Sequence, residues 1–289
     1  MNTLQIWISA ARPKTLAAGF SPVLLGTTLA IFEGSFNLLL FLMTLVTALG
    51  IQISANFAND YFDFIKGADT VKRKGPLRVT QSGFVSLSTM KKAIYISLGC
   101  TALTSLYLAF HGGLVISFLL ALSLLLAVLY TGGPYPLAYL GLGDLFVLVF
   151  FGPVAVSGTY FLQRGVFSLE SIWIGLGVGA LSTAVLAVNN LRDHEEDAIA
   201  KKKTLVVRFG RRFGQIEYAF CIGVGILLPF FFLVSHPYTL ISLFFILPAL
   251  PCLQSIFKIQ DPRGLNKTLA KTGQLILVYS LLFCIGWIL

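Results

Sequence analysis

Apolar runs long enough to cross a membrane recur along most of the 289-residue chain, and this feature leaves few folds open to it. Only 11% of the residues are charged and 56% are hydrophobic, whereas about a quarter of the residues of a typical soluble domain are charged. A segment surrounded by lipid must satisfy its backbone hydrogen bonds internally, so each run is expected to form an α-helix. The sequence therefore predicts an all-α integral membrane protein.

Nine of these runs approach the roughly 20 residues that a helix needs to cross the hydrocarbon core. We expect the nine spans near residues 16–33, 37–57, 93–111, 114–130, 143–162, 170–190, 216–234, 237–256 and 271–289. The short joins HGGL and SHPY are typical of turns, so they predict antiparallel hairpins of helices.

The basic residues predict the orientation of these spans, because lysine and arginine are enriched in cytoplasmic loops. With the N-terminus in the cytoplasm, all of the 21 lysines and arginines except Arg164 lie on the cytoplasmic side. Nine spans then place the C-terminus outside. The net charge of +9 is thus explained by membrane topology. Nucleic-acid binding is not indicated, because no nucleic-acid-binding motif accompanies the charge.

Two polar stretches follow the second and the sixth expected span on the cytoplasmic side. They read NFANDYFDFIKGADTVKRKGP from Asn56 and NNLRDHEEDAIAKKKT from Asn189. If each helix continues into its stretch, spacings of three, four and seven residues place two sets of side chains on one helix face each. These sets are Asn56, Asn59, Asp60 and Asp63 in the first stretch, and Asn190, Asp193 and Asp197 in the second. Glu195 and Glu196 lie off this face or at its edge and are expected to be surface charges.

Clustered carboxylates near lipid require a compensating cation. Mg²⁺ prefers oxygen ligands and commonly binds one or two carboxylates together with the phosphate oxygens of a substrate. Neighbouring basic side chains could complete a site for a diphosphate. They are Lys66, Lys72, Arg73, Lys74 and Arg78 in the first stretch, and Arg192, Lys201, Lys202 and Lys203 in the second. Membrane topology alone can explain why lysines occur in these loops. The carboxylates that share one helix face have no role in topology, and they favour a site for a metal-bound diphosphate.

The same two stretches resemble the aspartate-rich motifs of the UbiA superfamily of intramembrane aromatic prenyltransferases. Further stretches resemble the branch of this superfamily that acts on 1,4-dihydroxy-2-naphthoate, namely ARPKTLAAGFSPVLLG from Ala11, YTGGPYPLAYLGLGD from Tyr130 and FGPVAVSGTYF from Phe151. The resemblance covers the first six expected spans and the loop that follows them. It implies a single domain over residues 1–289, in which nine helices form a UbiA-type bundle with a lateral opening to lipid. The motif loops 56–92 and 189–215 would lie on the cytoplasmic side of the cell (inner) membrane.

The resemblance also implies an activity in menaquinone biosynthesis. A polyprenyl group is transferred from polyprenyl diphosphate to 1,4-dihydroxy-2-naphthoate, with loss of CO2 and diphosphate, to give a demethylmenaquinone. The resemblance further implies that Mg²⁺ assists ionisation of the polyprenyl diphosphate to an allylic carbocation and diphosphate. The implied partners are the two substrates and membrane lipid, with no nucleic acid.

The roles of the family fall on particular residues of this chain. The catalytic residues would be Asp60, Asp63, Asp193 and Asp197, and the metal ligands would be these four with Asn59, Asp69 and Asn190. The diphosphate would be bound by Asn56, Lys66, Lys72, Arg73, Lys74, Arg78, Arg192 and Lys203.

The residues that bind the acceptor are less defined by the sequence. Arg12 and Lys14 could contact the naphthoate carboxylate or the diphosphate, or could only anchor the first span. Gln81 and Ser82 could bond to the acceptor or only form a turn. The aromatic candidates for the wall facing the carbocation are Tyr130, Tyr135, Phe57 and Tyr61, and Tyr130 and Tyr135 are also candidates for contact with the acceptor.

Two alternatives remain open. Another enzyme of the superfamily, acting on 4-hydroxybenzoate, homogentisate or haem, would use the same metal site. The loop YTGGPYPLAY contains no lysine or arginine and resembles the naphthoate branch instead. A membrane transporter also carries intramembrane acids. The acids of transporters normally lie near the middle of the bilayer, however, whereas these lie at helix ends.

Overall fold

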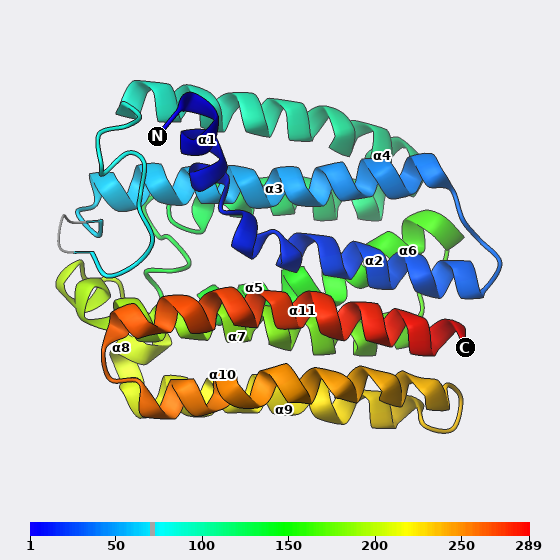
Figure 1. Ribbon diagram of the computed structural model, residues 1–289. Helices are drawn as coiled ribbons and strands as arrows, with labels where there is room; N and C mark the ends of the chain where they lie inside the picture. Colours follow the sequence, from blue (N-terminus) through cyan, green and yellow to red (C-terminus); the bar gives the residue numbers. More distant parts are fainter. Residues whose placement is uncertain (70–72) are drawn as a thin grey trace.

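Helices form all of the regular secondary structure in the residues that the structure, a computed structural model, describes, which are 1–69 and 73–289 (Figure 1). In chain order they are α1 (Thr3–Ala11), η1 (Pro13–Thr15), α2 (Ala17–Phe32), α3 (Leu38–Ile65), α4 (Leu87–Leu129), α5 (Gly143–Val149), η2 (Phe150–Val154), α6 (Ala155–Arg164), α7 (Leu169–Ile199), α8 (Leu205–Phe209), α9 (Arg211–Leu227), η3 (Leu228–Phe232), η4 (Pro237–Phe245), α10 (Ile246–Lys258), η5 (Pro262–Gly264) and α11 (Leu265–Ile288).

Seven helical segments of the described residues are long and apolar enough to cross a membrane. The number is eight if Thr3–Thr15 and Ala17–Phe32, which are bent by 54° relative to each other, form one broken span. The chain is therefore an integral membrane protein with an all-helical fold, as its apolar runs predict.

The long helix α4 turns back on itself in the HGGL stretch. Its 43 residues would extend about 65 Å if straight, roughly twice the thickness of the hydrocarbon core. Gly113 has a backbone conformation outside the helical region, with φ 67° and ψ −160°. Met90, near the start of α4, packs in one cluster with Phe57 of α3, while Thr131, just after α4, bonds to Asn59 of α3. Because both ends of α4 lie at the same end of α3, α4 consists of two antiparallel segments (Figure 1).

The residues of each aspartate-rich motif that are predicted to share one helix face lie on an uninterrupted helix. Asn37 caps the start of α3 by accepting a hydrogen bond of 3.1 Å from the Leu40 amide, and Ser168 caps α7 through the Glu170 amide at 3.1 Å. From these caps α3 continues to Ile65 and α7 continues to Ile199. The positions of these side chains are therefore set by helical geometry, as their spacing predicts, whereas Asp69 lies in the loop after α3.

The segment formed by α5 and η2 packs directly against α7. A Cβ atom on Gly175 would lie 2.6 Å from Pro153, and one on Gly179 would clash with the carbonyl oxygen of Leu148. Pro153 and the non-helical Gly152 break the helix at this point. Glycines thus let the two backbones touch, which is a common way of joining helices in a membrane, and this contact fixes the end of α5 and η2 against α7.

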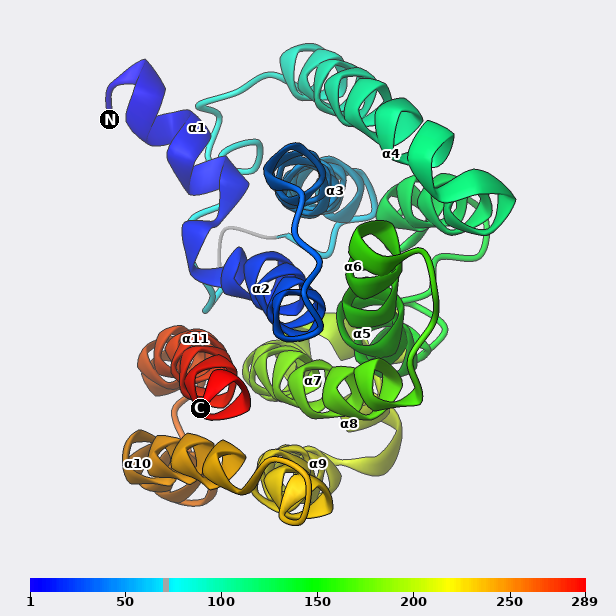
Figure 2. The same ribbon diagram turned by 90° about the vertical axis from the view of Figure 1, so that its right-hand side faces the viewer.

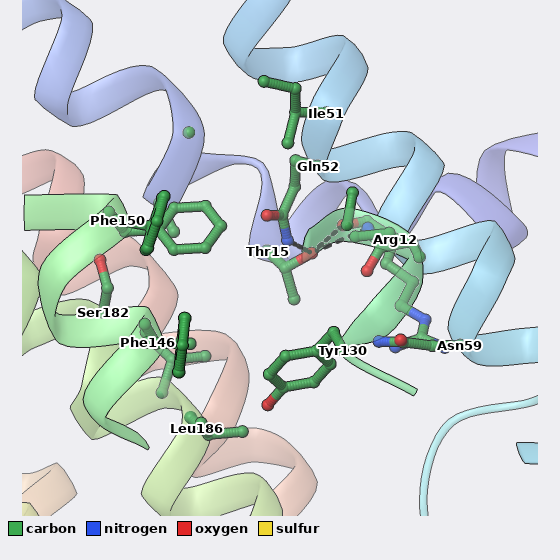
Figure 3. A pocket seen from close by; sticks show the side chains of 18 of the residues that line it. Arg12, Thr15, Ile51, Gln52, Asn59, Tyr130, Phe146, Phe150, Ser182 and Leu186 are labelled. Carbon is green, nitrogen blue, oxygen red and sulfur yellow. Dashed lines mark hydrogen bonds between the residues drawn. The ribbon is translucent and has the colours of Figure 1, made fainter. Parts of the chain in front are cut away.

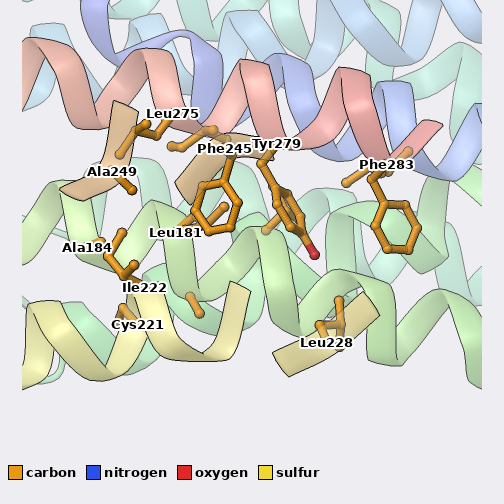
Figure 4. Close-up of a cluster of buried hydrophobic side chains, with 14 of the residues drawn as sticks. Leu181, Ala184, Cys221, Ile222, Leu228, Phe245, Ala249, Leu275, Tyr279 and Phe283 are labelled. Carbon is orange, nitrogen blue, oxygen red and sulfur yellow. The ribbon is translucent and has the colours of Figure 1, made fainter. Parts of the chain in front are cut away.

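Two hydrophobic clusters hold the bundle together. The larger cluster joins α2, the helices α6 to α11, η3 and η4, and includes Leu181, Phe245 and Tyr279 (Figure 4). The smaller cluster joins α1, α3, the start of α4 and the loop before α4, and includes Val79 and Met90. An end-on view shows α7, α9, α10 and α11 grouped together, with α3 and α4 on the other side of α2 and α6 (Figure 2).

Candidate active site

A cavity of about 630 Å³ lies between the two halves of the bundle, and most of the residues that line it are apolar (Figure 3). On α3 its lining extends from Thr44 to Asp63, a rise of about 28 Å for an α-helix and close to the thickness of the hydrocarbon core. Its polar end is formed by the ends of α3 and α7 and by the loop after α3. The cavity can therefore hold a long apolar chain that carries a polar group at one end.

Carboxylates of both motifs meet around one lysine at this polar end. The Lys202 ammonium nitrogen lies 3.8 Å from Asp63 Oδ2 and 3.6 Å from Asp197 Oδ1. Tyr139, in the loop after α4, donates a hydrogen bond of 3.1 Å to Asp63 Oδ1. The last turns of α3 and α7 thus face each other across a single ammonium group.

Two arginines of the loop after α3 link the remaining acids. Arg78 Nε lies 3.2 Å from Asp69 Oδ2, and Arg78 Nη2 lies 3.8 Å from Asp63 Oδ2. Arg73 pairs with Asp69, and its Nη2 donates to Asp193 Oδ2 at 3.1 Å. A small pocket lies among these side chains and shares several of its residues with the larger cavity. The site is therefore a cluster of alternating acidic and basic side chains in which both motifs take part.

Arg192 fixes the position of the second motif. Its Nε and Nη2 donate to the two oxygens of Asp193, each at 2.6 Å, and its Nη1 donates to Asn266 of α11 at 3.1 Å. Asn266 donates in turn to the backbone carbonyl of Lys74 at 2.9 Å. Arg192, whose exposed fraction is 2%, thus connects α7, α11 and the loop after α3.

Burial makes the charges of the site depend on one another. Burial raises the pKa of the Asp69 carboxyl to about 7, against the opposing effect of Arg73. Burial by itself lowers the pKa of the Lys202 ammonium, but Asp63 and Asp197 outweigh it and hold that pKa above its ordinary value. The ionised form of the Asp69 carboxyl group therefore depends on the nearby Arg73.

The groups of the site fit a divalent cation bound together with a diphosphate. Asp69 Oδ2 is buried and accepts no hydrogen bond from the described residues, and Arg73 Nε and Arg78 Nη1 are buried donors without a partner among them. Carboxylate oxygens are preferred Mg²⁺ ligands, and guanidinium groups bind phosphate oxygens. No three acidic, histidine or cysteine side chains of the described residues lie close enough to hold a metal ion by themselves. A metal at this site would therefore need oxygens from a bound diphosphate.

The comparisons with known proteins agree with this geometry. Residues 19–287 match the UbiA prenyltransferase family. The chain belongs to this family. It is 38% identical to the 1,4-dihydroxy-2-naphthoate octaprenyltransferase of Escherichia coli (strain K12), over 99% of this chain and 96% of the relative. It is 36% identical to the protein of the same name from Haemophilus influenzae, over 98% of this chain and 96% of the relative.

The fold is that of the UbiA family. The structure of a UbiA homolog from Archaeoglobus fulgidus bound to GPP and Mg²⁺ superposes with a TM-score of 0.64. The match covers 96% of this chain and 99% of the homolog, at 13% sequence identity.

Asp60 of this UbiA family member lies apart from the other motif aspartates. Its carboxylate is 1% exposed and accepts hydrogen bonds from the backbone amides of Val79 and Thr80, at 3.2 and 3.1 Å. It lines neither the cavity nor the small pocket. Asp60 therefore holds the loop that carries Arg78.

The three motif asparagines line the cavity and each bonds to another helix or loop. Asn59 Oδ1 accepts a hydrogen bond of 2.8 Å from the hydroxyl of Thr131, and Asn56 donates to a backbone carbonyl at the end of α1 at 2.8 Å. Asn190 donates to Asp144 Oδ1 at 3.2 Å. These amides join α3 and α7 to the segments that surround the polar end.

Two of the predicted basic residues lie beside the site. Lys66 donates to the backbone carbonyl of residue 131 at 2.8 Å, and its ammonium lies 4.5 Å from the ring centroid of Tyr139. Lys74 pairs with the side chain of Glu195, and its backbone amide donates to Glu196 at 2.9 Å. Glu195 is exposed, as expected of a surface charge. Glu196 is instead partly buried and lines the small pocket, so the same expectation is wrong for it.

The three consecutive lysines after α7 have different environments. Lys201 has a left-handed backbone conformation, with φ 57°. After this turn Lys202 enters the site, and Lys203 is exposed. The lysine of this run that reaches the predicted diphosphate site is therefore Lys202 and not Lys203. Lys72, also predicted to bind the diphosphate, lies outside the described residues.

Three of the predicted acceptor-binding residues line the cavity, namely Arg12, Lys14 and Tyr130. Arg12 Nη2 is buried and has no hydrogen-bond partner among the described residues. The Arg12 backbone is in the left-handed region, with φ 52°, at the bend between α1 and α2. Figure 3 shows Arg12 near Asn59, with the ring of Tyr130 projecting into the cavity.

The other predicted aromatic and polar residues do not line the cavity. Tyr135 is 76% exposed, and Gln81 and Ser82 lie on a turn near the surface. Phe57 and Tyr61 belong to the smaller hydrophobic cluster or pack against it. They stabilise the fold around α1 and α3.

Two residues of the site are absent from the sequence prediction. Asn189 lines both pockets and accepts a hydrogen bond of 2.5 Å from Arg192, and Tyr139 bonds to Asp63. Asn189 directly precedes the predicted Asn190, so the double asparagine is a signal that could have identified it. Tyr139 lies in the YPLAY stretch, and only its contact across the bundle distinguishes it from the tyrosines around it.

Proposed function

We propose that this chain transfers a polyprenyl group from polyprenyl diphosphate to 1,4-dihydroxy-2-naphthoate, with release of CO2 and diphosphate. The product would be a demethylmenaquinone, an intermediate of menaquinone biosynthesis. One observation carries the proposal. Carboxylates of α3 and α7 converge with Arg73, Arg78 and Lys202 at the polar end of an apolar cavity. The family and the names of the relatives support the same activity.

In this proposal the diphosphate of the donor lies at the polar end of the cavity. Arg73 and Arg78 have buried N–H groups without partners in the described part of the chain, and these would donate to the diphosphate oxygens, while Lys202 adds a positive charge. Asp63, Asp69, Asp193 and Asp197 would hold Mg²⁺ and, through the metal, the diphosphate. The metal would neutralise the charge that develops on the departing diphosphate. The solved UbiA homolog bound to GPP and Mg²⁺ supports this assignment.

The rest of the cavity would receive the prenyl chain and the acceptor. Its apolar walls keep water from the allylic cation, and burying the chain is favourable by about 0.8 kcal/mol for each CH2 group removed from water. Tyr130 presents an aromatic ring to the cavity near the polar end. Arg12, with a buried nitrogen that has no partner in residues 1–69 and 73–289, would bind the carboxylate of the naphthoate before that carboxylate is lost as CO2.

The roles proposed for the other motif residues follow from their contacts. Asp60 would act through the loop that it holds. Asn56, Asn59 and Asn190 would position the helices around the diphosphate. The exposed Lys203 would attract the two anionic substrates from solution, whereas the charge of Lys74 is balanced by Glu195.

We also propose that residues 1–289 form one domain with nine spans. The two antiparallel segments of α4 support the ninth span, and the two termini lie at opposite ends of the bundle (Figure 1). The distribution of basic residues supports a cytoplasmic N-terminus, cytoplasmic motif loops 56–92 and 189–215 and an external C-terminus. The long apolar helices support location in the cell (inner) membrane. A lateral opening beside α1 is supported by Ile8, which lines the cavity and is 49% exposed.

A direct test is to incubate the purified protein in lipid nanodiscs with Mg²⁺, octaprenyl diphosphate and one aromatic acceptor at a time. We expect mass spectrometry to detect a prenylated, decarboxylated product from 1,4-dihydroxy-2-naphthoate, and we expect no product from 4-hydroxybenzoate or homogentisate. Release of labelled CO2 from carboxyl-labelled naphthoate would report the coupled decarboxylation. Product from 4-hydroxybenzoate but not from the naphthoate would contradict the proposal.

A further inference from the structure

A buried carboxylate on the cavity wall has no part in the cluster of alternating charges. Asp144 is the second residue of α5, is 5% exposed and lines the larger cavity, but it does not line the small pocket between the motifs. Asn190 donates to its Oδ1 at 3.2 Å, and among the described residues this is the only side-chain hydrogen bond to the Asp144 carboxyl group. The Thr183 hydroxyl lies 3.4 Å from the backbone carbonyl of the same residue.

The partners of Asp144 differ from those of the motif aspartates that face the diphosphate. Asp63, Asp69, Asp193 and Asp197 each form an ion pair with at least one lysine or arginine. Within the described part of the chain, no basic side chain pairs with Asp144. A buried carboxyl group without a cation is costly, and a donor supplied by a ligand lowers this cost.

Asp144 also lies at the depth where the acceptor ring must bind. Its partner Asn190 precedes Asp193 on α7 by three residues, which places it about 4.5 Å deeper along the helix than the acids that face the diphosphate. The carbon that accepts the ring is bonded directly to the diphosphate oxygen, so the ring must bind next to the diphosphate on the side of the apolar cavity.

The surfaces around Asp144 suit a flat aromatic ring. The hydroxyl of Tyr130 packs against Gly143, where an added Cβ atom would lie 2.8 Å from it. Figure 3 shows the ring of Tyr130 between Arg12 on one side and Phe146 of α5 on the other. Two polar groups would face a ring in this space from different walls of the cavity. They are Arg12, at the bend between α1 and α2, and Asp144, in α5.

We propose that Asp144 accepts a hydrogen bond from a ring hydroxyl of the aromatic acceptor and thereby selects and orients that ring. This inference rests on the proposed function, because it names a residue for its acceptor. The carboxylate of the acceptor is repelled by Asp144 and attracted by Arg12, whereas a ring hydroxyl is a donor that Asp144 can use. The two walls thus impose one orientation on a hydroxynaphthoate. A hydrogen bond accepted by Asp144 also increases the electron density of the ring, which favours its attack on the allylic carbon.

The test compares ring acids that differ only in their hydroxyl groups. The probes are 1,4-dihydroxy-2-naphthoate and 2-naphthoate, whose binding is measured by naphthoate fluorescence in the presence of Mg²⁺ and inorganic pyrophosphate. The proteins are the wild type, Asp144→Ala, Asp144→Asn and the control Thr183→Val, which removes only the hydroxyl near the Asp144 backbone. Thermal unfolding of each protein shows whether it is folded, and the nearly isosteric Asp144→Asn keeps the test valid if Asp144→Ala does not fold.

We expect the wild type and Thr183→Val to bind the dihydroxy acid about 10- to 100-fold more tightly than 2-naphthoate, as for a hydrogen bond to a charged group. In Asp144→Ala the affinities for the two ring acids should differ by no more than a few-fold. In Asp144→Asn the difference should be intermediate, because the amide oxygen can still accept a hydrogen bond. Affinity for 2-naphthoate and KM for the prenyl diphosphate should stay within about threefold of the wild type.

Equal weakening of both ring acids in Asp144→Ala, or an unchanged preference in that variant and in Asp144→Asn, would overturn the inference. The proposed function is tested separately by the formation of prenylated product in the wild type. A wild type that prefers the hydroxylated ring through Asp144 but forms no product would contradict the function and leave this inference standing.

Discussion

The substitution Asp60→Asn tests whether Asp60 holds the loop after α3 or binds the substrate directly. Asp60 accepts two hydrogen bonds, from the amides of Val79 and Thr80, and Asp63, one helical turn later, contacts Arg78 and Lys202 instead. A hydrogen bond to a charged group contributes about 1.5–3 kcal/mol. The asparagine oxygen can still accept one of the two, so we expect the loop to lose about 2–3 kcal/mol of anchoring.

This loss predicts a specific kinetic pattern. Because the anchored loop carries Arg78, Asp60→Asn should raise KM for the prenyl diphosphate by about 30- to 150-fold and change kcat little. Asp63→Asn, the matched variant, removes a group that faces the reacting diphosphate, so kcat should fall by about 10²- to 10³-fold at any donor concentration.

The assay is steady-state product formation in nanodiscs over a wide range of prenyl diphosphate concentrations, together with hydrogen exchange of the Val79 and Thr80 amides. Exchange of these two amides should accelerate in Asp60→Asn and stay unchanged in Asp63→Asn. A loss of kcat in Asp60→Asn, with unchanged exchange at Val79 and Thr80, would refute the reasoning and make Asp60 a direct ligand of the metal or the diphosphate.

Further predictions concern the same site and the packing beneath it. EDTA should abolish product formation and Mg²⁺ should restore it, so activity that is indifferent to chelation would count against metal-bound diphosphate. Lys202→Ala should raise KM for the prenyl diphosphate about tenfold or more, whereas Lys201→Ala, one residue earlier, should stay within twofold. Tyr139→Phe should lower kcat/KM by about tenfold, because it removes a hydrogen bond to a charged group, and a wild-type value would contradict this role. Gly179→Val should destabilise the fold by about 1–3 kcal/mol, since its side chain meets the Leu148 carbonyl, and an unchanged unfolding temperature in detergent would contradict the packing.

The helices and the placement of both motifs could be predicted because they follow from local rules. Apolar runs in lipid must be helical, and a helix that continues past the membrane keeps Asn59 and Asp63 on one face. The turn near Gly113 also follows from local chemistry, since two adjacent glycines interrupt a run too long for one span.

The contacts of the loops could not be predicted from the sequence. Asp60 lies at the edge of the same helix face as Asn59 and Asp63, and only the path of the loop through Val79 and Thr80 decides what it meets. Lys202 and Lys203 are identical in type and adjacent, and the left-handed conformation of the residue before them determines which one enters the site. Such choices depend on tertiary packing between segments that are distant in the chain.

The most direct measurement of the central claim is an experimental structure of the protein with Mg²⁺ and a prenyl thiodiphosphate, a donor that ionises slowly. We predict one diphosphate at the polar end of the cavity, with Mg²⁺ about 2.0–2.1 Å from carboxylate oxygens of both α3 and α7, including Asp63 and Asp197. Arg73 and Arg78 should donate to the diphosphate oxygens. A diphosphate held by the residues of one motif alone, or bound at the other end of the bundle, would contradict the account.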